Sequence, residues 1–171
     1  MNRPEPNEYA PYYGNYVSQV AESADVLEVL DSQASDLRSM FEGLPEEKGS
    51  FTYADGKWTI KEVLSHLIDG ERMFAYRVLR ISRGDETPIE GFEQNDYIET
   101  SNANKRPFAS LLDEFDLQRR SNLILLNNLS DEASRRMGTA SGLPISTRAM
   151  TYIMAGHVLH HAAVLKERYS V

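Results

Sequence analysis

The chain has 171 residues, which fits one domain, and 41% of them are apolar, enough for one hydrophobic core. Its formal net charge of −8 and its scattered basic residues argue against a surface that binds nucleic acid. The sequence contains no cysteine, which excludes disulfides, thiolate metal ligands and a cysteine nucleophile. No apolar run reaches the length of about 18 residues that a membrane helix needs. We therefore expect a cytoplasmic protein that binds neither nucleic acid nor membrane.

The first part of the chain predicts an arm followed by a helix. Residues 1–22 contain three of the seven prolines and four tyrosines, so we expect an irregular N-terminal arm that packs its aromatic rings on the domain. A single domain is expected over residues 23–169. Apolar residues at offsets of three, four and seven predict an amphipathic helix over 23–43.

A second helix follows the polar loop 45–57. Thr59 is a good N-cap, and Glu62 three residues later completes a capping box. The apolar pattern continues to about Ser82, so this stretch predicts one long helix.

His66 lies on the second turn of this helix, and Gly70 follows one turn later on the same face. A glycine inside a helix costs up to about 1 kcal/mol relative to alanine. Two interpretations explain Gly70 equally well: a side chain omitted to leave room beside His66, or close packing against another helix.

Residues 84–106 are polar and form a connection of unusual length for a compact domain. We interpret them as a crossover that passes over one end of a bundle. Pro107 is well placed as the first residue of a third helix, expected over 107–129.

The last helix is expected to start at Ser146 or Thr147, both competent caps, and to run to about Tyr169. Residues 138–144, with two glycines and a proline, predict a loop or a tight hairpin before it. The chain shows no alternation typical of strands over a useful length. Four long helices predict an all-α, four-helix bundle.

Three of the four histidines, His157, His160 and His161, lie within five consecutive residues of the last helix. His157 and His161 are four apart, so they are neighbours on one helix face and can reach one metal ion together. With His66 as a third ligand from another helix, they form a candidate site for a divalent ion such as zinc or nickel. His160 either substitutes as a ligand or lies beside the site at its rim.

The surrounding residues narrow the chemistry. No glutamate follows His157, which excludes the zinc-protease motif, and no pair of Glu-x-x-His motifs supports a di-iron site. Asp69 and Glu71 lie close to His66 in sequence. Either carboxylate can orient a ligand imidazole, or both can face water, as charged residues on helices usually do.

Two segments together resemble the DinB-like superfamily, which includes bacillithiol- and mycothiol-dependent S-transferases. They are residues 57–67, around His66 and followed by Glu71, and residues 153–161, around the histidine triplet. The likeness spans residues 23–168. It implies an up-down-down-up four-helix bundle with a long crossover between helices 2 and 3. It also implies a divalent metal held by three histidines and a homodimer.

The resemblance implies an enzyme in which a metal-bound, low-molecular-weight thiol attacks a small electrophilic molecule. A hydrolase that uses a metal-bound hydroxide needs the same ligands, so the sequence does not separate the two. Two interpretations without catalysis stay open as well: a bundle that only binds a metal or a ligand, and a bundle with core histidines and no metal. The loops 84–106 and 131–146 are expected to shape the substrate pocket.

Overall fold

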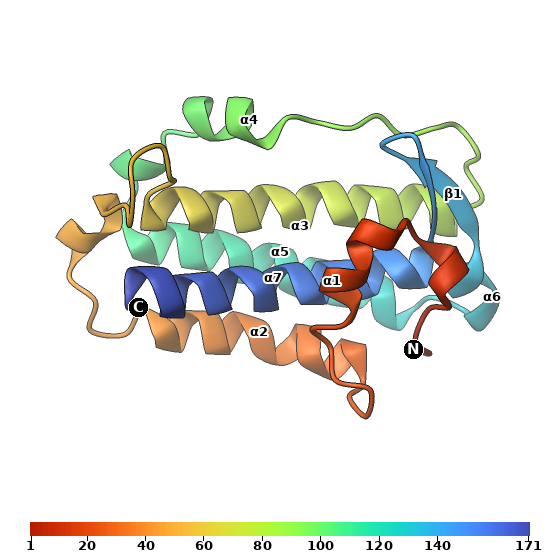
Figure 1. Cartoon of the computed structure of the whole chain (residues 1–171). Helices are drawn as coiled ribbons and strands as arrows, with labels where there is room; N and C mark the ends of the chain where they lie inside the picture. The colour runs from red at the N-terminus through yellow and green to blue at the C-terminus, as the bar shows by residue number, and fades with distance from the viewer.

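The computed structural model describes all residues from 1 to 171 and shows four long helices packed side by side (Figure 1). They are α2 (Val26–Met40), α3 (Ile60–Ser82), α5 (Phe108–Asn127) and α7 (Thr147–Tyr169). Helices α2 and α7 run in one direction, and α3 and α5 run in the opposite direction. The predicted up-down-down-up bundle is therefore confirmed, and no helix in it has the length and apolar composition that crossing a membrane requires.

The helix starts follow the predicted capping chemistry. Thr59 and Glu62 form the reciprocal capping box at the start of α3, and the Ser146 side chain caps α7. Helix α2 begins later than predicted because the Asp25 side chain caps it. Pro107 is the N-cap of α5 rather than its first residue.

Several short elements connect and cover these helices. They are the 3-10 helices η1 (Pro6–Glu8), η2 (Pro11–Tyr13), η3 (Glu46–Ser50) and η4 (Ala103–Lys105), the helices α1 (Gly14–Val17), α4 (Gln94–Thr100) and α6 (Asp131–Arg135), and the strands β1 (Met137–Ala140) and β2 (Leu143–Ser146). The crossover that carries α4 returns along α3, and the hairpin lies at the opposite end of the bundle from the C-terminus (Figure 1).

The two strands form an antiparallel hairpin, so this stretch adopts the hairpin rather than the loop, although the sequence predicted no strand here. Ser141 and Gly142 both have positive φ angles, 53° and 77°, the pattern of a type I′ turn. Ile89 of the crossover bridges to Ala140 and thereby joins the crossover to the hairpin.

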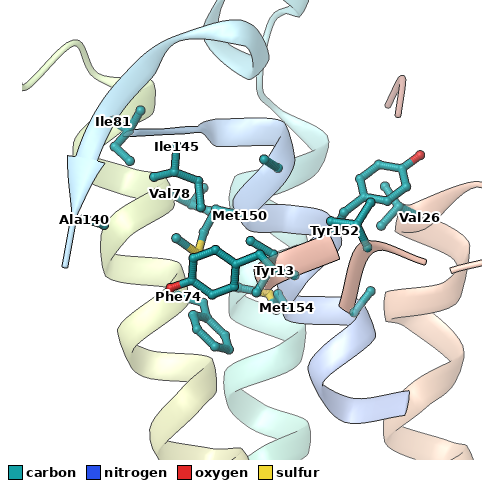
Figure 2. Close-up of a cluster of buried hydrophobic side chains, with 14 of the residues drawn as sticks. Tyr13, Val26, Phe74, Val78, Ile81, Ala140, Ile145, Met150, Tyr152 and Met154 are labelled. Atoms are coloured by element: carbon teal, nitrogen blue, oxygen red, sulfur yellow. The ribbon is translucent and has the colours of Figure 1, made fainter. Parts of the chain in front are cut away.

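The N-terminal arm consists of short helical turns that pack on α3 and α7. Tyr13 is buried among Phe74 of α3 and Met150 of α7 (Figure 2). A Cβ atom on Gly156 would lie 1.9 Å from the backbone oxygen of Tyr16, so only glycine allows the arm to cross α7 this closely. The division of the chain into arm and domain stays a prediction.

Two hydrophobic clusters fill the bundle, one of 19 and one of 14 buried residues. Between them lies a polar group that we call the Arg119 layer, formed by Gln33, Glu71, Arg119 and Asn122. Arg119 donates from Nε and Nη2 to the two carboxylate oxygens of Glu71, at 3.0 and 2.6 Å, and from Nη1 to Gln33 at 2.6 Å. Asn122 donates to Glu71 at 3.0 Å. Each charged group of the layer therefore has a partner.

Candidate metal centre

His66 of α3 and His157 and His161 of α7 converge between these two helices. Each offers a ring nitrogen, and these atoms lie within 4.8 Å of one another. The ring centroids form a nearly equilateral triangle with sides of 4.6 to 4.8 Å. His66 and His157 point the same kind of nitrogen, Nε2, at one another across 2.8 Å. The structure thus brings together all three residues predicted as ligands, and their binding of a metal stays a prediction.

Gly70 makes this convergence possible. A Cβ atom at this position would lie 3.1 Å from Cε1 and 3.3 Å from Nδ1 of His157. Contacts as short as these require the imidazole to move. Both interpretations of Gly70 therefore apply. Helix α7 packs closely on α3, and the His157 ring fills the space that a side chain at position 70 would occupy.

Burial keeps the three imidazoles neutral. It lowers the pKa of His66 to about 4 and that of His161 to about 3. The pKa of His157 lies well below its ordinary value, first because of burial and then because of the neighbouring His161 and His66. Neutral imidazoles have free lone pairs at pH 7, and three of them are a donor set suited to zinc or nickel. The residues present therefore fit a divalent ion.

Aromatic rings enclose the cluster. The Trp58 ring lies 4.8 Å from that of His66, and the rings of Phe74 and Tyr16 lie 5.2 and 5.6 Å from that of His157. These rings limit how far the imidazoles can turn and how much water surrounds them.

Neither carboxylate considered as a partner hydrogen-bonds to an imidazole. Glu71 does not face water as charged helix residues usually do, because it is buried in the ion pair with Arg119. Asp69 is partly buried and lies 3.9 Å from Arg72. The structure therefore contradicts an orienting role for either residue.

His160 is exposed and lies outside the cluster. Its ring is 5.1 Å from that of His161 and 5.7 Å from that of Tyr16. The structure therefore places His160 at the rim of the site, the second of its two predicted positions.

Two cavities reach different members of the cluster. The first, the His161 cavity, has a volume of about 310 Å³ and is lined by Trp58, Val63, Asn95, His160, His161 and Val164 among others. The second, the Arg77 cavity, has a volume of about 300 Å³ and reaches His66 and His157. Its wall also includes Tyr16, Phe74, Arg77, Phe92, Gln94 and Ser141.

The loops expected to shape a pocket do so. Phe92, Gln94 and Asn95 come from the crossover 84–106, and Ser141 comes from the loop 131–146. Gln94 and Asn95 are consecutive residues at the start of α4, and each lines a different cavity. The crossover therefore contributes residues to both cavities.

Arg77 and Tyr16 line the Arg77 cavity but were not among the residues selected from the sequence. A signal for Arg77 exists, because eleven residues separate it from His66 and seven from Gly70. Both separations correspond to nearly whole helix turns and place the three residues on one face of α3. The sequence holds no comparable signal for Tyr16, because its position depends on how the arm folds back.

Comparison with known proteins places this chain in a family. The sequence model of the DinB superfamily matches residues 29–165. A Geobacillus thermodenitrificans protein named "Putative metal-dependent hydrolase" is 25% identical over 131 residues, which cover 74% of this chain and 72% of that protein. A Geobacillus kaustophilus protein of the same description is 26% identical over 133 residues, covering 75% and 74%.

Among solved structures, YfiT from Bacillus subtilis superposes with a TM-score of 0.72 at 20% identity, over 88% of this chain and 93% of that one. YfiT is described as "a probable metal-dependent hydrolase with an unusual four-helix bundle topology". The likeness to YfiT shows a common fold. With its match to the family over most of its length, the chain belongs to the DinB superfamily.

Proposed function

We propose that this protein is a metal-dependent hydrolase in which His66, His157 and His161 hold a divalent ion such as zinc or nickel. The observation that carries the proposal is the meeting of three neutral imidazoles within 4.8 Å, beside two cavities. The names of the two Geobacillus relatives, which describe metal-dependent hydrolases, support it.

The histidines supply the binding chemistry. His66, His157 and His161 would hold the ion, which when bound would supply Lewis acidity toward a substrate carbonyl and toward water. Burial keeps His66, His157 and His161 free of protons, so no proton competes for their lone pairs at neutral pH. The aromatic rings of Trp58 and Phe74 fix the imidazoles in place.

Two further side chains are in positions to donate a hydrogen bond or to accept a proton. Burial raises the pKa of Tyr16, so its hydroxyl remains protonated and can donate a hydrogen bond to a substrate oxygen in the Arg77 cavity. No carboxylate hydrogen-bonds to the cluster. His160, at the rim beside His161, is the remaining imidazole in a position to accept a proton from water.

Metal analysis tests the site itself. Purified protein loaded with Zn²⁺ or Ni²⁺ and then dialysed is expected to hold about one ion per chain, because only one group of three ligands is present. The variant His157→Ala is expected to hold almost none. A metal content near zero in the loaded wild-type protein would contradict the proposal.

Assays on a panel of small esters and amides test the reaction. Hydrolysis is expected to stop when a chelator removes the ion and to return when Zn²⁺ is added. Adding a low-molecular-weight thiol separates the proposal from thiol transfer: consumption of the thiol, with no reaction in its absence, would favour an S-transferase.

The predicted homodimer and small-molecule substrate stay predictions. Sedimentation equilibrium measures whether the protein is a homodimer.

A further inference from the structure

Arg77 is a buried cation without a counter-charge. Its exposed fraction is 2%, and it forms no ion pair with any carboxylate. Only Nη2 is hydrogen-bonded, to Ser141 Oγ at 2.9 Å and to the backbone oxygen of Glu90 at 3.4 Å. Nε is buried and has no partner, and Nη1 makes no hydrogen bond to a protein atom. A buried charge is normally paired with an opposite charge. The protein supplies no carboxylate for this guanidinium, so the missing anion must come from a ligand.

Arg77 forms part of the wall of the Arg77 cavity, which also reaches His66 and His157. One small molecule in this cavity can therefore touch both the proposed metal site and the cation. Ser141 accepts a hydrogen bond from Arg77 through Oγ, which leaves its own O–H free to donate. The rest of the wall combines apolar faces, such as those of Phe74 and Phe92, with the amide of Gln94.

We propose that Arg77 binds a carboxylate group of the substrate and so orients the substrate toward the histidine cluster. That the bound carboxylate belongs to a substrate rests on the proposed function. The anion site itself does not depend on a metal. A single guanidinium with a hydroxyl beside it matches the single charge and planar shape of a carboxylate. A phosphate dianion would need more cations than this cavity contains.

Binding of benzoate, measured by isothermal titration calorimetry, tests the proposal. Benzamide, which has the same shape and no charge, is the matched control for the ligand. We expect benzoate to bind at least about tenfold more tightly than benzamide, because only benzoate forms charge-assisted hydrogen bonds. Equal affinities, or tighter binding of inorganic phosphate than of benzoate, would overturn the proposal. This comparison requires no substitution.

Two variants locate the benzoate. Arg77→Met, which keeps the length of the side chain and removes its charge, is expected to lower benzoate affinity about 10- to 100-fold. His161→Ala, which lies outside the Arg77 cavity and removes a proposed metal ligand, is expected to change it less than about threefold. If His161→Ala abolishes binding and Arg77→Met does not, benzoate binds the metal, and the anion site at Arg77 is refuted while the metal site is supported.

Arg77→Lys guards against a variant that fails to fold. It retains the charge and loses the planar fork, so we expect an affinity between those of the wild-type protein and Arg77→Met. Wild-type affinity in a folded Arg77→Met protein, shown by an unchanged thermal melt, would mean that Arg77 only ties the crossover to the hairpin. Loss of benzoate binding in Arg77→Met, in a protein without metal-dependent hydrolysis, would support the anion site and refute the hydrolase.

Discussion

Two polar regions lie close together in this bundle and treat their buried charges in opposite ways. In the Arg119 layer, the guanidinium donates to both oxygens of Glu71, and its remaining nitrogen donates to Gln33 and to the backbone oxygen of Leu30. In the region that we call the cavity face, formed by His66, Arg77, His157 and His161, Arg77 has no carboxylate partner and its buried Nε has no hydrogen-bond partner. The layer is complete without a ligand, whereas the cavity face is not.

The difference separates structure from function. A buried ion pair without hydrogen-bond partners is destabilising, so a layer whose members satisfy one another indicates a role inside the bundle. Polar groups that are buried and left without partners cost free energy, and functional sites are where proteins retain such groups. The two arginines, Arg119 and Arg77, have almost the same exposure, 1% and 2%, so their partners and not their burial distinguish their roles.

The largest expected effect is on stability and belongs to the layer. Glu71→Ala leaves Arg119 buried without its counter-charge and is expected to lower the free energy of unfolding by about 3–5 kcal/mol. Arg77→Met removes an unpaired charge and is expected to change it by less than about 1 kcal/mol. Urea unfolding at pH 7 measures both. Equal losses would show that the two regions do not differ.

The next effect concerns the metal and belongs to the cavity face. His161→Ala is expected to lower metal affinity at least about 100-fold, since loss of a direct ligand exceeds the 10- to 100-fold loss typical of its supporting residues. His160→Ala is expected to change it less than about tenfold, because His160 is exposed at the rim. Competition with a chromophoric chelator measures these affinities. Equal losses would mean that the ligand set is wrong.

A region could be predicted from the sequence when its interacting residues lie close together along the chain. The helix starts depend on residues a few positions apart, so Thr59 and Glu62 announced α3 correctly. His157 and His161 are related by one helix turn, and His66 was chosen as the third ligand from its place on the predicted helix before the resemblance to a family implied the same three residues. The convergence of these residues could therefore be predicted from helix periodicity and from the likeness to a family.

The partners of the buried charges could not be predicted from the sequence. Glu71 finds Arg119 48 positions along the chain, and Arg77 meets Ser141 64 positions along it. No local pattern encodes which helix faces which, so the sequence left open whether Glu71 orients an imidazole or faces water, and it does neither. The arm is a similar case, since Tyr16 reaches the cluster only because Gly156 admits the backbone across α7.

Acid is expected to weaken the cavity face. Burial lowers the pKa of His66 to about 4 from its ordinary value of 6.5, so the unfolded chain binds this proton more readily than the folded one. The stability of the metal-free protein should therefore fall as the pH drops from 6.5 toward 4, by up to about 3 kcal/mol for this group. Above pH 6.5 this dependence disappears because both states are neutral.

The variant His66→Asn isolates this effect, because asparagine does not titrate. Its stability in chelator should fall less steeply between pH 6.5 and 4 than that of the wild-type protein, when both are measured by urea unfolding. Parallel curves would show that His66 is protonated as easily in the folded protein as in the unfolded chain.

The smallest expected effect on stability comes from Gly70→Ala, in which two contributions oppose one another. Alanine favours the helix by up to about 1 kcal/mol, but its Cβ would lie 3.1 Å from Cε1 of His157 and must displace that ring. We expect stability to change by less than about 1 kcal/mol and metal affinity to fall about tenfold. Gly14→Ala is the matched control, since a Cβ there meets no atom within 4 Å. A Gly70→Ala protein with higher stability and unchanged metal affinity would show that the imidazole tolerates displacement, and that Gly70 serves helix packing alone.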